Sequence, residues 1–238
     1  MKIQRIDELL VEFRLKVQEY YICLHFAANG LKEAAEMFEQ DKPKPTAKLW
    51  LSDITMGEDG AATINKHYAS IAVSEYLSSS RENGSFSNEI AKAFVCAIYS
   101  LWDEKYRVLI ARDARVDQRK VSADLMGDLR HIRNCIVHSK SILKDEHSKV
   151  KVLNWSLQPG ELIITKKMFA DFIDQINTMP VAVEQMGSPL VQRFYDELSL
   201  KQKKQFDKWI AEQGPGADIR TWPQWESVTR GMPWVKGA

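Results

Sequence analysis

Residues 122–138 read SADLMGDLRHIRNCIVH, and the spacing of their apolar side chains predicts an amphipathic helix. At about 100° per residue, the core-type side chains of this segment fall within roughly 60° of one another on the helical wheel. They are Leu125, Leu129, Ile132 and Ile136. We therefore expect this stripe to face the core and the opposite face of the helix to carry polar groups.

The polar face of the same segment carries an arginine, an amide and a histidine: Arg133, Asn134 and His138. A guanidinium can hold a phosphodiester and an imidazole titrates near neutral pH, so this set could bind a phosphate and move a proton. On the wheel, Asn134 and His138 lie about 170° and 150° from the core stripe. As an i, i+4 pair they can act together. The alternative is that Arg133 and His138 are solvated side chains at a helix end, where cations interact favourably with the helix dipole.

Positive charge is concentrated around this segment. Between residues 105 and 151 the chain has twelve Lys and Arg against six Asp and Glu, whereas the whole chain has a net charge of +1. This excess favours a polyanionic partner near the motif. Gly127 and Val137 border the polar face, and such a face suits contact with a symmetry mate. We therefore expect a homodimer in which two Arg–His sets meet.

The composition is that of a soluble globular protein, with 45% hydrophobic and 27% charged residues in 238. Cys23, Cys96 and Cys135 lie far apart in apolar patterns, and we expect reduced core cysteines. The N-terminal residues regain charge too early for a signal peptide, and no apolar run reaches the roughly 18 residues that a membrane span needs. We therefore expect a cytoplasmic protein with no membrane segment. The sequence shows no spacing typical of a metal site and no cofactor motif.

The other periodic segments predict further helices. We expect them over residues 3–39 with a break at Asn29-Gly30, over 59–77, over 88–111 with Ser87 as the cap, over 166–178 and, as one or two helices, over 189–213. A β-hairpin is expected to pair residues 150–155 with residues 161–165 through a turn at 158–160. We place a first domain at residues 1–185 and an extension at 186–238. The tail of this extension carries Trp222, Trp225 and Trp234 and has no regular period.

Taken together, these features resemble the HEPN superfamily, whose members are helical bundles that often act as ribonucleases. The resemblance rests first on Arg133-Asn134 followed by His138. It rests also on the aromatic and acidic residues from Ser100 to Tyr106, and on the downstream order of loop, strand pair and closing helix. It covers residues 1–180 in layout. The expected fold is therefore mostly α: a HEPN-like helical bundle with a small β-hairpin after the motif helix and a C-terminal helical and irregular extension.

The resemblance implies metal-independent cleavage of RNA that leaves 2′,3′-cyclic phosphate ends, at a composite site formed at a homodimer interface. In that reading His138 is the general base or acid, and Arg133 holds the phosphate as charge builds on it. Asn134 orients the histidine or binds the phosphate. No cofactor and no metal ion is implied.

Three further residues are expected to support substrate binding, namely Arg130, His131 and Lys140. Some HEPN toxins carry a modifiable tyrosine two positions after the histidine. Lys140 stands at that position here, so this mode of control is not expected. The resemblance also implies a toxin or phage-defence role, with a protein antitoxin or regulator as a partner.

Two alternatives stay open. One is a non-catalytic HEPN-like module that binds RNA or a protein partner, and the other is a helical interaction protein in which the motif arises by chance. The tryptophan-bearing tail either stacks on bases or packs against the protein. Asp128 is expected to be an ordinary ion-pairing carboxylate, and His147 is expected to lie alone in a loop.

Overall fold

The computed structural model describes residues 2–58, 60–114, 116–144, 149–184, 189–213, 218–230 and 232. The chain divides into two compact units. The first unit comprises residues 1–6, 107–122 and 181–238, and the second comprises residues 7–106 and 123–180. Helices dominate the described residues, so the expected mostly α fold is confirmed. The motif helix lies in the second unit, and the expected extension at 186–238 falls within the first.

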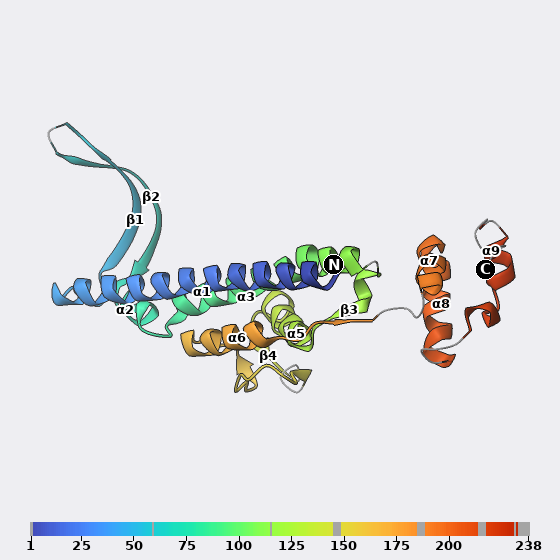
Figure 1. Cartoon of the computed structure of the whole chain (residues 1–238). Helices are drawn as coiled ribbons and strands as arrows, with labels where there is room; N and C mark the ends of the chain where they lie inside the picture. The colour runs from blue at the N-terminus through green and yellow to red at the C-terminus, as the bar shows by residue number, and fades with distance from the viewer. Residues whose placement is uncertain are drawn as a thin grey trace. The chain divides into compact units, whose positions relative to one another are not determined.

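The second unit is built on a long helix, α1 (Lys2–Gln40), which runs alongside α3 (Ser85–Leu101) (Figure 1). Phe13 and Leu24 are buried on its inner face. The break expected at Asn29-Gly30 is wrong, because α1 continues through both residues. The Asn29 side chain bonds to the ring of His25 and accepts from Lys166, so it does not compete for the hydrogen bonds of its own backbone.

Helix α3 begins two residues before Ser87, which was expected to cap it. Gly84 is the N-cap residue, and Ser87 Oγ donates to the Gly84 carbonyl at 3.0 Å. A side chain at position 84 would collide with the Ser79 carbonyl oxygen, so the close approach requires glycine. The helix expected over 88–111 continues as a wider π-helical turn, η1 (Trp102–Tyr106), and as α4 (Arg107–Ala114), which belongs to the first unit.

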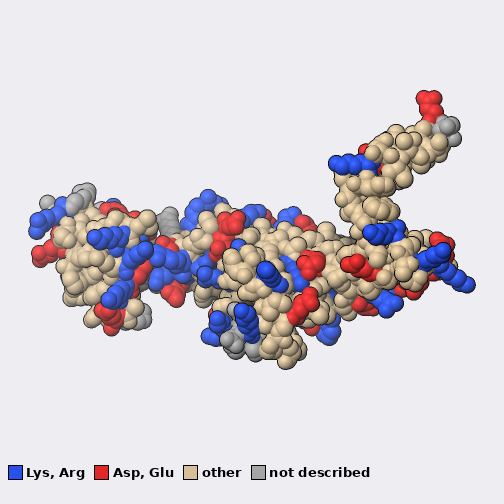
Figure 2. Space-filling model, turned by 180° about the vertical axis from the view of Figure 1, so that it is seen from behind, with Lys and Arg blue, Asp and Glu red and all other residues tan. Residues whose placement is uncertain are grey.

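A β-hairpin replaces most of the helix expected over residues 59–77. Strands β1 (Lys48–Met56) and β2 (Ala62–Ala72) pair antiparallel and form an arm that projects from the body near the end of α1, and only α2 (Val73–Ser80) is helical (Figure 1). Thr63, Ile64 and Tyr68 favour strand, and Gly60 supplies a turn residue with φ of 78°. Both faces of the arm are exposed and mostly uncharged (Figure 2). Its sequence therefore lacks the alternation of a half-buried strand.

The motif helix α5 (Asp124–His138) and the closing helix α6 (Lys166–Thr178) agree with the predicted ranges. Thr165 caps α6 by accepting from the Met168 amide, as a capping threonine does. The predicted hairpin after the motif exists with different strands. Strand β4 (Ile142–Leu143) pairs with β5 (Gly160–Glu161), and residues 150–155, expected as a strand, form none.

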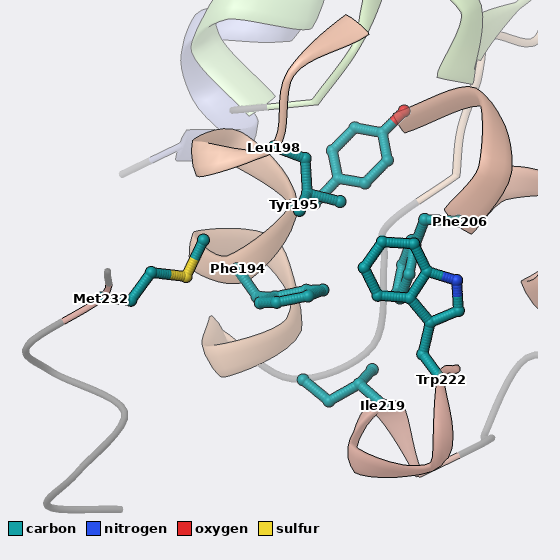
Figure 3. Close-up of a cluster of buried hydrophobic side chains, with 7 residues drawn as sticks. All are labelled: Phe194, Tyr195, Leu198, Phe206, Ile219, Trp222 and Met232. Atoms are coloured by element: carbon teal, nitrogen blue, oxygen red, sulfur yellow. The ribbon is translucent and has the colours of Figure 1, made fainter. Parts of the chain in front are cut away.

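The first unit contains a separate aromatic core. Its elements are α4, η2 (Gln118–Lys120), β3 (Val121–Ser122), β6 (Ala182–Val183), α7 (Pro189–Glu197), α8 (Leu200–Gln213), η4 (Ile219–Thr221) and α9 (Trp225–Thr229), with β3 and β6 paired antiparallel. Phe194, Phe206 and Trp222 pack edge to face, with ring centroids 5.2–5.8 Å apart (Figure 3). Trp222 is therefore packed inside the unit, and Trp234 lies outside the described residues, as does His147.

The three cysteines differ in burial. All are free thiols, and Cys135 is buried as expected, Cys96 is half-buried and Cys23 is exposed. The expectation of a core position is therefore wrong for Cys23, which lies on the outer side of α1. Within the described part of the chain, no helix combines the length and the apolar run that crossing a membrane requires.

Candidate functional site

Helix α5 separates apolar and polar side chains onto two faces. The buried face holds three of the expected residues, Leu125, Leu129 and Ile132. Ile136, expected in the same stripe, is half-buried. On the polar face Arg133 and Asn134 are half-buried and His138 is exposed. Because His138 is still helical, the spacing that places these three side chains on one face holds to the end of the motif.

A hollow of about 470 Å³ opens at this polar face, where α5 packs against α3. The end of α3, the π-turn η1 and α5 contribute its walls. Its lining residues are Tyr99, Ser100, Asp103, Glu104, Arg130, Arg133, Asn134 and His138. All of them belong to the second unit, so the hollow is formed within one compact part of the chain.

Arg133 links the two other residues of the motif. Its Nη1 donates to Asn134 Oδ1 at 3.2 Å and lies 3.5 Å from His138 Nε2. A guanidinium has N–H donors and no acceptor, so the second contact requires a lone pair on Nε2. The neutral histidine with its proton on Nδ1 satisfies that requirement. A proton acceptor and a fixed cation are therefore presented side by side toward the hollow.

The π-turn places two carboxylates opposite these cations. Trp102 and Tyr106 are both buried against Phe13, with ring centroids 5.5 and 5.2 Å from it, whereas Asp103 and Glu104 line the hollow. The wider turn changes which side chains share a face, so successive residues can serve the core and the hollow. The aromatic and acidic cluster noted in the sequence thus divides into two core aromatics and two site carboxylates.

A polar network supports the back of η1. Glu12 Oε1 accepts from Lys105 Nζ and from the Tyr106 hydroxyl, each at 2.9 Å. The hydrogen bond from Lys105, followed by that from Tyr106, lowers the pKa of Glu12. Burial, more than the contact with Glu12, raises the pKa of Tyr106. This network joins α1 to the turn that carries the site carboxylates.

Cys96 on α3 lies within the electrostatic influence of the motif. Burial raises the pKa of its thiol, and the positive charge of Arg133 acts in the opposite direction. The neutral thiol is therefore the stable form of this half-buried side chain at neutral pH.

Of the three predicted supporting residues, only Arg130 lines the hollow. His131 is half-buried on α5 and is not among the lining residues of the described chain. Lys140 is exposed beyond the helix end and is not among them either. Lys140 and Ser141 adopt left-handed φ angles of 52° and 61°, and the Ser141 amide donates to the Cys135 carbonyl at 3.2 Å. This closes the helix as a left-handed cap at a cost of about 1–2 kcal/mol for each non-glycine residue.

Asp128 is buried, which corrects the expectation of an ordinary ion-pairing carboxylate. Its Oδ2 accepts the backbone amides of Lys151, Val152 and Leu153 at 2.9, 2.6 and 2.9 Å. A carboxylate that accepts several amide hydrogens holds a loop firmly to a helix. This anchor explains why residues 150–155 do not pair as a strand. The position of Asp128 on the buried side of α5 was the available sequence signal.

The cluster of positive charge noted in the sequence does not form one surface of the site unit. Residues 107–122, which carry several of those cations, belong to the first unit. The second unit has 18 Lys and Arg against 23 Asp and Glu, and the first has 15 against 9. The hollow therefore lies in an acidic unit, and its local cations are Arg130 and Arg133.

In the part of the chain that the structure describes, no group of three or more His, Cys, Asp or Glu is placed to hold a metal ion. No family model, no curated protein and no solved structure matches this chain.

Proposed function

We propose that this chain is a metal-independent endoribonuclease of HEPN type and that the hollow beside α5 is its active site. The observation that carries the proposal is the 3.5 Å contact between Arg133 Nη1 and His138 Nε2 at an open hollow. A cation that holds a phosphodiester and a base that accepts a proton are the two groups that transesterification of RNA needs.

The chemistry follows from these positions. His138 Nε2 takes the proton of a ribose 2′-hydroxyl, and the 2′-oxygen attacks the adjacent phosphorus. The bond from phosphorus to the 5′-oxygen breaks, and this oxygen receives a proton from the imidazolium through the solvent of the open hollow. The products carry a 2′,3′-cyclic phosphate and a 5′-hydroxyl. Arg133 offsets the charge that builds on the phosphate oxygens.

Asn134 acts as a positioning residue in this proposal. Its side-chain oxygen accepts from Arg133 Nη1, so it fixes the guanidinium rather than the imidazole. Asp103 and Glu104 close the opposite wall, where they disfavour additional phosphates. Cleavage at a single flexible phosphodiester fits this hollow better than binding of a rigid duplex.

The test is cleavage of a labelled single-stranded RNA in EDTA by the wild type and by His138→Ala and Arg133→Ala. We expect each variant to lose at least about 100-fold in rate, as removal of a general base or of a charge-stabilising group does. His131→Ala is the matched control, because His131 lies on the same helix and outside the hollow. Equal cleavage by all four proteins would point to a contaminating nuclease and would refute the proposal. RNA binding without cleavage would favour the non-catalytic module.

The composite site at a homodimer interface stays a prediction. Mixing Arg133→Ala with His138→Ala protein tests it, because a composite site predicts partial recovery of cleavage from complementary chains. No recovery would mean that the Arg133 and His138 of one chain work together. A toxin or phage-defence role, restrained by an antitoxin or regulator, predicts growth arrest on expression that His138→Ala relieves.

A further inference from the structure

Helix α1 carries apolar side chains on two opposite faces. Its inner face is buried in the second unit. Its outer face exposes Val11 by 51%, Leu15 by 54%, Ile22 by 52% and Phe26 by 72%. We call these four residues the α1 stripe. Single exposed apolar residues are ordinary, but a row of four large ones along one helix is typical of a contact surface.

The α1 stripe is a continuous feature of the helix. At about 100° per residue its four members lie within roughly 60° of one another, about 170° away from the buried residues. Those buried residues are Phe13, Val17 and Leu24. A helix that is apolar on two faces is normally covered on both. The described residues of the chain cover only the inner face.

The spacing of the α1 stripe is symmetric about the midpoint between residues 18 and 19. Val11 and Phe26 are equally far from this point, and so are Leu15 and Ile22. We propose that a second copy of this chain covers the stripe, with the two α1 helices antiparallel about a two-fold axis at that midpoint. Such an interface uses the same patch on both copies. Val11 of one copy then faces Phe26 of the other, and Leu15 faces Ile22.

Charge favours the antiparallel arrangement. In this register the exposed Glu12 of one copy faces His25 of the other, and Glu19 faces Gln18. A parallel pairing about a two-fold axis along the helices would bring each glutamate against its own equivalent. Like charges held that close oppose association. The residues that border the stripe therefore select the direction that the symmetric spacing indicates.

The area of this contact sets its strength. With one turn beyond each end of the stripe the paired region is about 33 Å long and, at a helix diameter of about 11 Å, covers roughly 700 Å² on the two copies together. This is at the low end for a specific interface, so we expect a dimer that dissociates at micromolar concentration. The α1 stripe is not the motif face, and the pairing does not depend on the proposed nuclease activity.

Sedimentation velocity from about 1 to about 200 µM protein spans the expected dissociation range. We expect the wild type to pass from monomer to dimer and Leu15→Glu with Ile22→Glu to remain monomeric, a loss of at least about 100-fold in affinity. Ile163→Glu is the matched control, because Ile163 is also 52% exposed and lies outside α1. A monomeric wild type throughout, or a dimer that the double glutamate variant leaves intact, would overturn the proposal. A circular dichroism melt confirms that each variant is folded.

The register has its own test. In a Cys23→Ser background, Leu15→Cys with Ile22→Cys places two facing cysteine pairs within disulfide reach across the helices. We expect mild oxidation to give a covalent dimer. Val11→Cys with Leu15→Cys is the control, because those positions face Phe26 and Ile22 and find no cysteine. Equal cross-linking of both variants would contradict the antiparallel register.

Discussion

Replacing Asp128 by alanine removes the only carboxylate that the structure shows accepting the amides of Lys151, Val152 and Leu153. Hydrogen bonds to a charged group contribute about 1.5–3 kcal/mol each. Lys151 and Val152 lie at the surface, where water can replace the acceptor, whereas the Leu153 amide is buried. We therefore expect Asp128→Ala to lower the free energy of unfolding by about 3–5 kcal/mol. Asp128→Asn keeps one acceptor oxygen, and about 1–2 kcal/mol is expected.

Urea unfolding followed by circular dichroism measures this loss, and hydrogen exchange locates it at residues 151–153. Asp124→Ala is the matched control, because Asp124 is an exposed carboxylate in the first turn of the same helix. Its removal should cost only about 0.3–1 kcal/mol through the helix dipole. If Asp128→Ala and Asp124→Ala were equally stable, or if the amides of residues 151–153 kept their protection, the anchoring role assigned to Asp128 would be refuted.

Three other predictions concern groups around the site. Lys140→Gly should raise the free energy of unfolding by about 0.5–1 kcal/mol, because glycine adopts the left-handed φ of 52° without strain; unchanged stability in urea unfolding would count against the strained cap. Cys96 should react with iodoacetamide at higher pH than Cys23, because burial raises the pKa of Cys96 and the thiolate is the nucleophile; single-thiol variants compared across pH would reveal the reverse order. Hydrogen bonds from Lys105 and Tyr106 lower the pKa of Glu12, so its carboxylate stabilises the fold above the ordinary value of 4.5, and this contribution disappears as pH falls through the lower folded pKa. The stability difference between wild type and Glu12→Gln should therefore shrink on acidification, and a difference independent of pH would contradict the network.

The sequence predicted those elements whose apolar side chains have one buried face. Helices α5 and α6 were predicted close to their observed bounds, because each places a row of apolar residues against a single core. The two helices expected within residues 189–213 are present as α7 and α8. Periodicity is informative wherever burial is one-sided.

The errors have a common physical origin in tertiary contacts and two-sided exposure. The arm was missed because both its faces are exposed, so its strands show no alternation of apolar and polar residues. Residues 150–155 do alternate, yet their amides bond to Asp128, a partner more than twenty residues away. Asn29-Gly30 has the composition of a helix break, but packing and long-range bonds from the Asn29 side chain keep α1 continuous.

The candidate site was predictable in part. Helical spacing was sufficient to place Arg133, Asn134 and His138 on one face, because all three belong to one element. The wall formed by Asp103 and Glu104 depends on the π-turn and on the packing of α3 against α5, which no local pattern encodes. Charge counted along the sequence was misleading for the same reason, since neighbouring residues belong to different units.

Mass spectrometry of the ends left on a defined RNA after incubation in EDTA addresses the assigned chemistry directly. Proton removal by His138 beside a phosphate held by Arg133 predicts 2′,3′-cyclic phosphate and 5′-hydroxyl ends from the wild type, and neither end from His138→Ala. Ends with a 3′-hydroxyl and a 5′-phosphate, or the same cyclic ends from His138→Ala, would contradict the role given to this histidine.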